Sequence, residues 1–269
     1  MTAPQTTPAL PDRWFRTTPD SSVRGGPRLL ARSLIRAADL DERIGFYEQL
    51  FGVPADLRMP IPDFGGLELA AVGNLLLIAS VRPFTPIQRQ TAYSLIVPSL
   101  VAQLETVRRA GGTVVEPPER ILPGARARVR YPDGSLAELV EHRPQPGEEP
   151  RPPAAATGGD RAGRTRLVAR RKVPLTAFDE AVASYEKLLE AEARVHEVRH
   201  RPAAPLTLAL VGNLLLIGSD EPDPDGGAAT AVALLASTEG HGPRAMVSLP
   251  DGVLAEVWDL DAAGRRPGR

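Results

Sequence analysis

Cysteine is absent from the 269-residue sequence. Disulfide bonds, thiolate metal ligands and cysteine nucleophiles are therefore excluded. Lysine is nearly absent as well, because Lys172 and Lys187 are the only two and arginine supplies almost all of the positive charge. Together with the abundance of alanine, proline and glycine, this bias indicates a GC-rich bacterial genome.

Long apolar runs and net charge are also lacking. No stretch approaches the roughly 20 apolar residues that span a membrane, and the N-terminus has neither the basic start nor the apolar run of a secretory signal. We therefore expect a cytoplasmic protein. The formal net charge of −1 provides no basic field for nucleic acid or an anionic membrane, so neither is an expected partner.

Four motifs occur twice in the same order. "VGNLLLIAS" at Val72–Ser80 returns as "VGNLLLIGS" at Val211–Ser219. Likewise "RLLAR" returns as "RLVAR", "LDERIGFYEQLFG" as "FDEAVASYEKLLE", and "YPDGSLAELV" as "LPDGVLAEVW". A shared order of four matches indicates that the chain contains a duplicated domain.

The first copy is expected to contain two β-α-β-β-β modules. A strand at 29–36 precedes a helix that Asp39 is expected to cap and Gly52 to end, and three short strands follow up to residue 80. The second module begins with the strand "AYSLIV", continues with a helix that starts at Ser99, and ends with two strands joined by the turn "PDGS". This pattern predicts an α+β fold.

Composition also predicts the domain boundaries. We expect a flexible N-terminal arm at 1–27, a first domain at 28–142, a Pro- and Gly-rich linker at 143–165, a second domain at 166–260 and a tail at 261–269. Trp14 and Phe15 are candidates for docking the arm. The second copy is 21 residues shorter and lacks one helix and one strand. The first domain or the arm is therefore expected to cover the exposed sheet face.

The order of these motifs resembles the vicinal oxygen chelate superfamily, which includes glyoxalase I, bleomycin-resistance proteins, fosfomycin-resistance enzymes and extradiol dioxygenases. The resemblance covers residues 29–142 and 166–260. It implies that paired β-α-β-β-β modules form cupped mixed sheets, with the second domain truncated. It also implies a ligand in the cup, often on a divalent metal that a first-strand histidine and a last-strand glutamate hold.

The resemblance places the two glutamates at Glu138 and Glu256. The histidine position, seven residues before the start of the helix, falls on Arg32 in the first copy and Arg170 in the second. A guanidinium has no lone pair for a metal. We therefore expect no metal site of the family type and no cofactor, and instead an arginine–glutamate pair in each cup. The alternative is that both arginines face solvent, because a strand register miscounted by one residue reverses the faces.

Two aromatic residues are further candidates for the ligand site. Trp258 follows Glu256 by two residues, so both side chains lie on the same strand face. It is expected either to stack on a flat ligand or to plug the second cup. Tyr93 is expected to line the first cup or to pack in the core.

The sequence "HEVRH" at His196–His200 matches the zinc motif H-E-x-x-H, in which Glu197 would be the general base. The repeat aligns it with "RMPIP", where prolines exclude a helix interior. "RVHEVRH" also alternates like a strand, so we expect histidines on a strand or loop. His142 and His241 are interpreted as isolated surface residues.

The expected function is metal-independent binding of a small organic molecule in the first cup, as in bleomycin-resistance-type proteins, with Arg32 and Glu138 orienting it. The alternative is a lyase, isomerase or dioxygenase that uses Glu138 as a metal ligand or as a general base with a raised pKa. A third possibility is a scaffold that binds another protein. We expect a monomer with an internal pseudo-dimer, or a homodimer.

Overall fold

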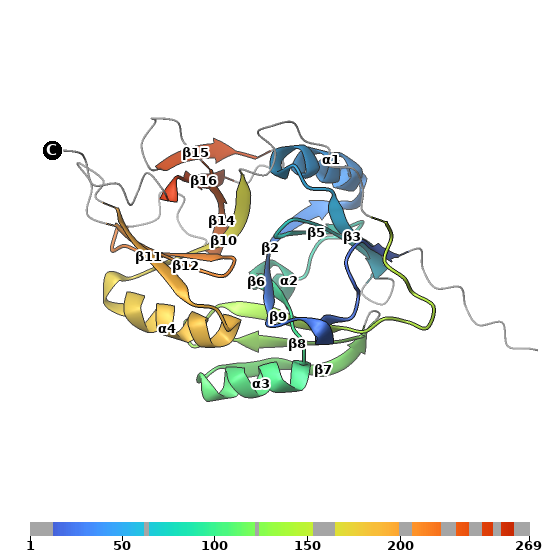
Figure 1. Cartoon of the computed structure of the whole chain (residues 1–269), viewed down its shortest axis with the longest axis horizontal. Helices are drawn as coiled ribbons and strands as arrows, with labels where there is room; N and C mark the ends of the chain where they lie inside the picture. Colours follow the sequence, from blue (N-terminus) through green and yellow to red (C-terminus); the bar gives the residue numbers. More distant parts are fainter. Residues whose placement is uncertain are drawn as a thin grey trace, which may run out of the picture.

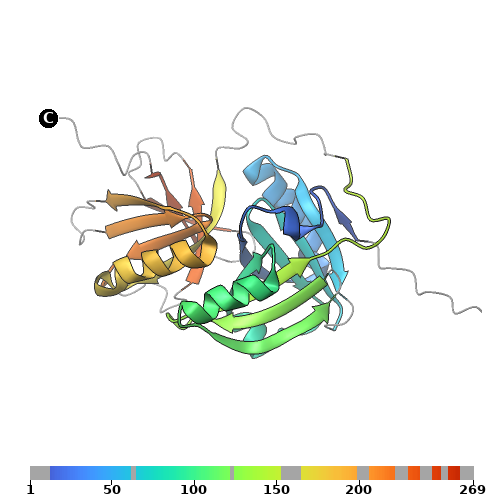
Figure 2. The ribbon, with the colours of Figure 1, turned by 60° about the horizontal axis from the view of Figure 1, so that its bottom comes forward.

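Two curved β-sheets lie side by side, one from each half of the chain (Figures 1 and 2). The computed structural model describes residues 13–61, 65–121, 124–152, 165–198, 206–221, 230–236, 244–249 and 254–260. No helix in these ranges is long and apolar enough to span a membrane.

The first sheet has nine strands in the order β1-β3-β4-β5-β2-β6-β9-β8-β7. In chain order these are β1 (Trp14–Phe15), β2 (Arg28–Arg36), β3 (Ala55–Ile61), β4 (Leu67–Val72), β5 (Leu75–Ser80), β6 (Thr91–Ile96), β7 (Thr113–Ile121), β8 (Gly124–Arg130) and β9 (Leu136–His142). The helices of this half are η1 (Ser21–Val23), η2 (Ala37–Asp39), α1 (Leu40–Phe51), α2 (Pro86–Gln90) and α3 (Leu100–Arg109). The predicted α+β fold with mixed sheets is confirmed.

The second sheet has seven strands in the order β11-β12-β13-β10-β14-β16-β15. Its elements are β10 (Arg166–Val173), η4 (Leu175–Ala177), α4 (Phe178–Leu189), β11 (Ala193–Val198), β12 (Leu206–Val211), β13 (Leu214–Gly218), β14 (Thr230–Leu235), β15 (Arg244–Ser248) and β16 (Leu254–Trp258). This order repeats that of β3-β4-β5-β2-β6-β9-β8. In the described part of this half, no element corresponds to α3 or β7, which are the helix and strand that the shorter sequence lacks.

The ends of the main helices follow local chemistry. Gly52 adopts a left-handed φ of 65° and ends α1, and the Ser99 side chain accepts a hydrogen bond from Ala102 N at the start of α3. Asp39 is the N-cap residue of α1, as expected, but its side chain makes no capping hydrogen bond. Its carboxylate instead pairs with Arg36, at 2.9 and 3.0 Å from the Nε and Nη2 atoms, because the 3₁₀ turn η2 precedes the helix.

Residues 13–27 of the predicted arm pack on the first half, where Trp14 and Phe15 dock them as expected. β1 pairs with β3, and Phe15 is buried. The Ser21 hydroxyl donates a hydrogen bond to Val97 O at 2.7 Å. The predicted linker also contacts this segment. Arg151 N donates a hydrogen bond to Phe15 O at 2.7 Å. Residues 1–12 lie outside the described ranges.

The repeated "VGN" sequence forms the junction between the halves. Asn74 Nδ2 donates to Leu167 O on β10 at 3.3 Å, and Asn213 Nδ2 donates to Leu29 O on β2 at 3.2 Å. The two asparagines also bind each other at 2.9 Å. They are the only asparagines in the chain. Each hairpin therefore satisfies the backbone of the opposite half, which explains why both copies retain the motif.

One apolar core continues across this junction. Val232, Leu234 and Ala255 from β14 and β16 belong to the same buried cluster as the core residues of the first half. The first half therefore helps to cover the truncated side of the second, as expected. A polar link adds to this contact, because Tyr185 OH on α4 donates to Asp133 Oδ2 at 2.6 Å in the β8–β9 turn.

Replacing either junction asparagine is expected to destabilise the fold. Asn74→Ala or Asn213→Ala removes a half-buried amide and leaves a carbonyl of the other half without its donor, at a cost of about 1–2 kcal/mol. Urea denaturation measures the effect, with Gln49→Ala on the exposed face of α1 as the control. The double variant is expected to be non-additive by ~0.5 kcal/mol or more, since the amides touch. If the single variants lose no more stability than the control and their effects simply add, the two asparagines do not link the halves.

Candidate functional site

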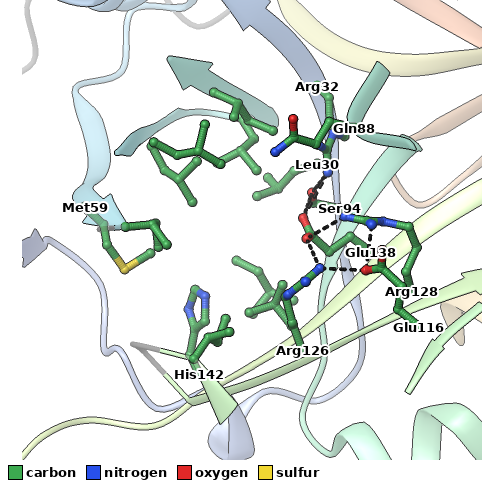
Figure 3. Close-up of a pocket in the computed structure, with 18 of the residues that line it drawn as sticks. Leu30, Arg32, Met59, Gln88, Ser94, Glu116, Arg126, Arg128, Glu138 and His142 are labelled. Carbon is green, nitrogen blue, oxygen red and sulfur yellow. Dashed lines mark hydrogen bonds and ion pairs between the residues drawn. The ribbon is translucent and has the colours of Figure 1, made fainter. Parts of the chain in front are cut away.

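The concave side of the first sheet contains a cavity of about 310 Å³ (Figure 3). Most of its wall is aliphatic, and one side is charged. The apolar lining residues are Leu30, Leu57, Met59, Ile61, Leu67, Leu69, Leu76, Ile78, Ile87, Ile96, Ile121 and Val140. The polar lining residues are Arg32, Thr85, Gln88, Ser94, Glu116, Arg126, Arg128, Glu138 and His142.

Strand alternation determines which side chains face the cavity. On β9 the residues two apart, Glu138, Val140 and His142, all line it. The parallel register of β6 with β9 aligns Ser94 with Glu138. The central strand β2 contributes Arg32 between them and β5. Three neighbouring strands therefore bring Arg32, Ser94 and Glu138 to one end of the hollow, whereas His142 lies at the other end (Figure 3).

Arg32 and Glu138 form an ion pair in the wall of the cavity. Arg32 Nη1 lies 2.9 Å from Glu138 Oε2 and also donates to Ser94 Oγ at 3.0 Å. The two side chains are 5% and 18% exposed, so the pair is largely removed from water. The arginine–glutamate pair that the resemblance implied is therefore present in the first cup, and the solvent-facing alternative for Arg32 is wrong.

Two further arginines, which the sequence reading did not identify, complete this cluster. Arg128 Nη2 and Arg126 Nη1 lie 3.3 and 3.4 Å from Glu138 Oε1, and both guanidinium groups also contact Glu116 (Figure 3). The signal was present in "ARARVRY", because alternate arginines on the strand next to Glu138 share one face. Which face that is depends on the sheet register.

The pKa of Glu138 is lower than the ordinary value of a glutamate. Burial opposes ionisation of this carboxyl, but the positive charges of Arg32, Arg128 and Arg126 outweigh it. The expectation of a raised pKa, which would suit a general base near neutral pH, is therefore wrong. Glu138 is an ionised acceptor that is already bound by four donors.

His142 is not a surface residue, contrary to the sequence interpretation. It is 7% exposed, and its ring faces the cavity at the end away from Arg32 (Figure 3). Burial, together with the positive charges of Arg13, Arg24 and Arg28, lowers its pKa to about 4, while Asp56 acts in the opposite direction. The ring is thus uncharged at neutral pH. His142 follows Glu138 by four residues on one strand, and this even spacing places both side chains on the same face. The sequence contained this signal.

Tyr93 does not line the cavity. Its neighbour Ser94 does, so the alternation of β6 directs Tyr93 to the opposite face. There it is fully buried and packs edge-on against Tyr185 of the second half, with ring centroids 6.4 Å apart. Tyr93 is therefore a core residue of the junction, which was the other expectation for it.

Comparison with solved structures identifies the fold. A mutant of 4-hydroxymandelate synthase from Streptomyces coelicolor matches 79% of this chain and 72% of its own length, with 15% identity and a TM-score of 0.51. The vicinal oxygen chelate superfamily includes that synthase. This chain has the vicinal oxygen chelate fold.

Other matches are more partial or less similar. The 2,3-dioxygenase LapB from Pseudomonas sp. KL28 matches over 85% of this chain and 90% of its own, with 15% identity and a TM-score of 0.48. An uncharacterized protein from Methanosarcina mazei is 32% identical over 43% of this chain and 92% of its own, with a TM-score of 0.39. No protein-family model matches the sequence, and a search of curated proteins gave no match.

The residues at the position where the resemblance implies metal ligands do not fit a metal. The donor set around Glu138 consists of three guanidinium groups and a serine hydroxyl, and a guanidinium has no lone pair to coordinate with. Within the described ranges, no three His, Cys, Asp or Glu side chains lie together as metal ligands would. The polar end of the cup is therefore built from ion pairs.

The second half repeats the ion pair but fills the cup. Arg170 Nε and Nη2 bind the two carboxylate oxygens of Glu256 at 3.1 Å each, with both residues buried. Trp258 donates from Nε1 to Glu256 at 2.9 Å and is fully buried in the apolar cluster of this sheet. Of the two roles expected for Trp258, the geometry matches the plug.

The zinc motif at His196–His200 is excluded by its backbone. Residues 193–198 form the strand β11, antiparallel to β12, so they lack the one-turn helical spacing that this motif requires. His200 and His241 lie outside the described residues.

Removing the Glu138 carboxylate is expected to destabilise the protein strongly. Glu138→Ala leaves Arg32, Arg126 and Arg128 buried with too little negative charge, a loss of about 3–5 kcal/mol. Urea denaturation tests this, with Glu105→Ala in the exposed ion pairs of α3 as the control, which is expected to stay within ~0.5 kcal/mol of the parent. If Glu138→Ala behaves like that control, the buried ion cluster is not the constraint described above.

His142 is expected to make stability depend on pH. Its folded-state pKa of about 4 lies below the ordinary 6.5, so the unfolded chain binds a proton that the folded protein does not. Stability is therefore complete above pH 6.5 and falls, by up to about 3 kcal/mol, as the pH decreases toward 4. Denaturation at several pH values measures it, and His142→Leu is expected to remove this component. An identical pH dependence in the variant would contradict the burial of a neutral imidazole.

Proposed function

We propose that the first half binds a small organic molecule in its cup without a metal ion. The observation that carries this proposal is the open apolar cavity beside the Arg32–Glu138 pair, at the position where the superfamily has its metal-binding histidine and glutamate. Ligand sites of small molecules are concave, mainly apolar, and carry a few convergent polar groups. This cavity has each of these properties.

The two halves differ at one position in a way that supports a ligand role for the first cup alone. Val140 and Trp258 each lie two residues after the glutamate of the repeated motif in their half, in "PDGSLAELV" and "PDGVLAEVW". Val140 lines the open cavity, whereas Trp258 is fully buried. The small residue leaves space that the indole occupies in the other half.

The enzymatic alternative would need Glu138 to accept a proton or bind a metal. The four donors on its carboxylate and its low pKa both oppose these roles. We therefore favour sequestration or carriage of a metabolite or drug, as in bleomycin-resistance-type proteins of bacteria, in the cytoplasm. A single chain is expected to suffice, since its two halves pair as two subunits would.

Filling the first cup is expected to abolish binding. Val140→Trp introduces the side chain that the second half already accommodates beside its own arginine–glutamate pair. Fluorescence titration with the uncharged probe N-phenyl-1-naphthylamine in EDTA is expected to show one site in the parent and at least ~10-fold weaker binding in this variant. Val101→Trp, on the exposed side of α3, is the matched control and is expected to bind like the parent.

Native mass spectrometry of the freshly purified protein accompanies this titration. A retained organic molecule on a monomer supports the proposal. Stoichiometric Zn, Fe, Mn or Ni, or probe binding that appears only after such a metal is added, would overturn the metal-independent function and favour the enzyme. Equal probe binding by the parent and Val140→Trp would move the site out of the cup.

A further inference from the structure

The charged groups of the cup are already bound to one another. Glu138 has contacts from Arg32, Ser94, Arg126 and Arg128, which match the roughly four lone-pair sites of a carboxylate. Glu116 lies between Arg126 and Arg128, at 3.0 and 2.6 Å from their nearest nitrogens. The Nε atoms of Arg32 and Arg128 have no hydrogen-bond partner, but both atoms are fully buried. The cluster therefore presents few accessible unused hydrogen-bonding positions to a ligand.

The same cluster is balanced in charge. Glu119, at the more exposed edge on β7, also pairs with Arg126. Three guanidinium groups thus face three carboxylates. A ligand with a charged group would have to break one of these pairs or remain desolvated without a counter-ion, and both are costly in an apolar cavity.

His142 differs from every residue in that cluster. All its hydrogen bonds with described residues involve its backbone, which Ser21 and Arg143 hold in place. The Phe15 ring of the N-terminal segment packs against the imidazole in a T-shaped arrangement, with the ring centroids 6.0 Å apart. A neutral imidazole offers one N–H donor and one nitrogen acceptor, and here both remain available at the cavity wall.

We infer that the ligand of the first cup is an uncharged, mainly apolar molecule with a hydroxyl or carbonyl group that hydrogen-bonds to the His142 imidazole. This rests on the proposed function and names the ligand class for the same site. The ion cluster acts as a closed polar wall that keeps the sheet together, while His142 selects the ligand. The equivalent position in the second half, four residues after Glu256, is Leu260, so only the first cup has this group.

Four probes with one carbon skeleton test the inference at pH 7.5: 3-phenylpropan-1-ol, propylbenzene, 3-phenylpropanoate and 3-phenylpropylammonium. Protein-observed NMR titration in EDTA gives their affinities. The alcohol is expected to bind at least ~10-fold more tightly than either ion and ~5-fold more tightly than propylbenzene. In His142→Leu the advantage of the alcohol over propylbenzene is expected to disappear, and in His142→Gln part of it is expected to remain.

The outcomes separate the inference from the proposed function. Unchanged propylbenzene affinity in His142→Leu shows that the cup is intact and supports a selective role for the imidazole. Tighter binding of either ion, or an alcohol preference that survives His142→Leu, overturns the inference and leaves binding in the cup standing. If none of the four probes binds at millimolar concentration and Val140→Trp leaves N-phenyl-1-naphthylamine binding unchanged, both proposals fail.

Discussion

The compensation of a buried carboxylate by guanidinium groups is the constraint on which each half depends. Glu138 lies on β9 and Glu256 on β16, and each is reached from the central strand of its sheet by an arginine. A buried unpaired charge costs several kcal/mol, so each glutamate ties its own strand to the central strand of its sheet, which is distant in sequence. An ion pair can provide this link at the position where the resemblance expects a metal to do so.

Both halves contain the same arginine–glutamate pair, but the side chain beside the pair differs between them. In the first, the residue two positions after the glutamate is a valine, the hollow is open, and a neutral histidine at the end of the same strand lines it. In the second, a fully buried tryptophan stands at that position and donates to the glutamate. The two halves are therefore equivalent frames, of which one has an open cavity and the other carries a buried tryptophan at the matching position.

The stability of the open half depends on its neighbours. The second half shares its core with the first, and the paired asparagines at the hairpins fix the two sheets against each other. The N-terminal segment closes another side, because Phe15 packs in the apolar cluster of the cup and against His142. A cavity within a sheet needs such support, since its lining residues lack packing partners on one side.

The sequence by itself determined the duplication, the α+β pattern, the resemblance to the superfamily and the positions of Arg32, Glu138, Arg170 and Glu256. These features depend on local order and on a residue count along one strand. Gly52 and Ser99 were also predictable, because a left-handed helix end and a helix cap have local chemical causes.

Only the tertiary structure decided which face of each strand looks into the cup. A shift of one residue exchanges the two faces, so Tyr93 was open to either side until the pairing of β6 with β9 placed Ser94 inward. Arg126, Arg128 and His142 were identified only when neighbouring strands brought them to Glu138 or to the far wall. The lowered pKa of His142 depends on burial and on arginines that are distant in sequence, and no local pattern contains those distances.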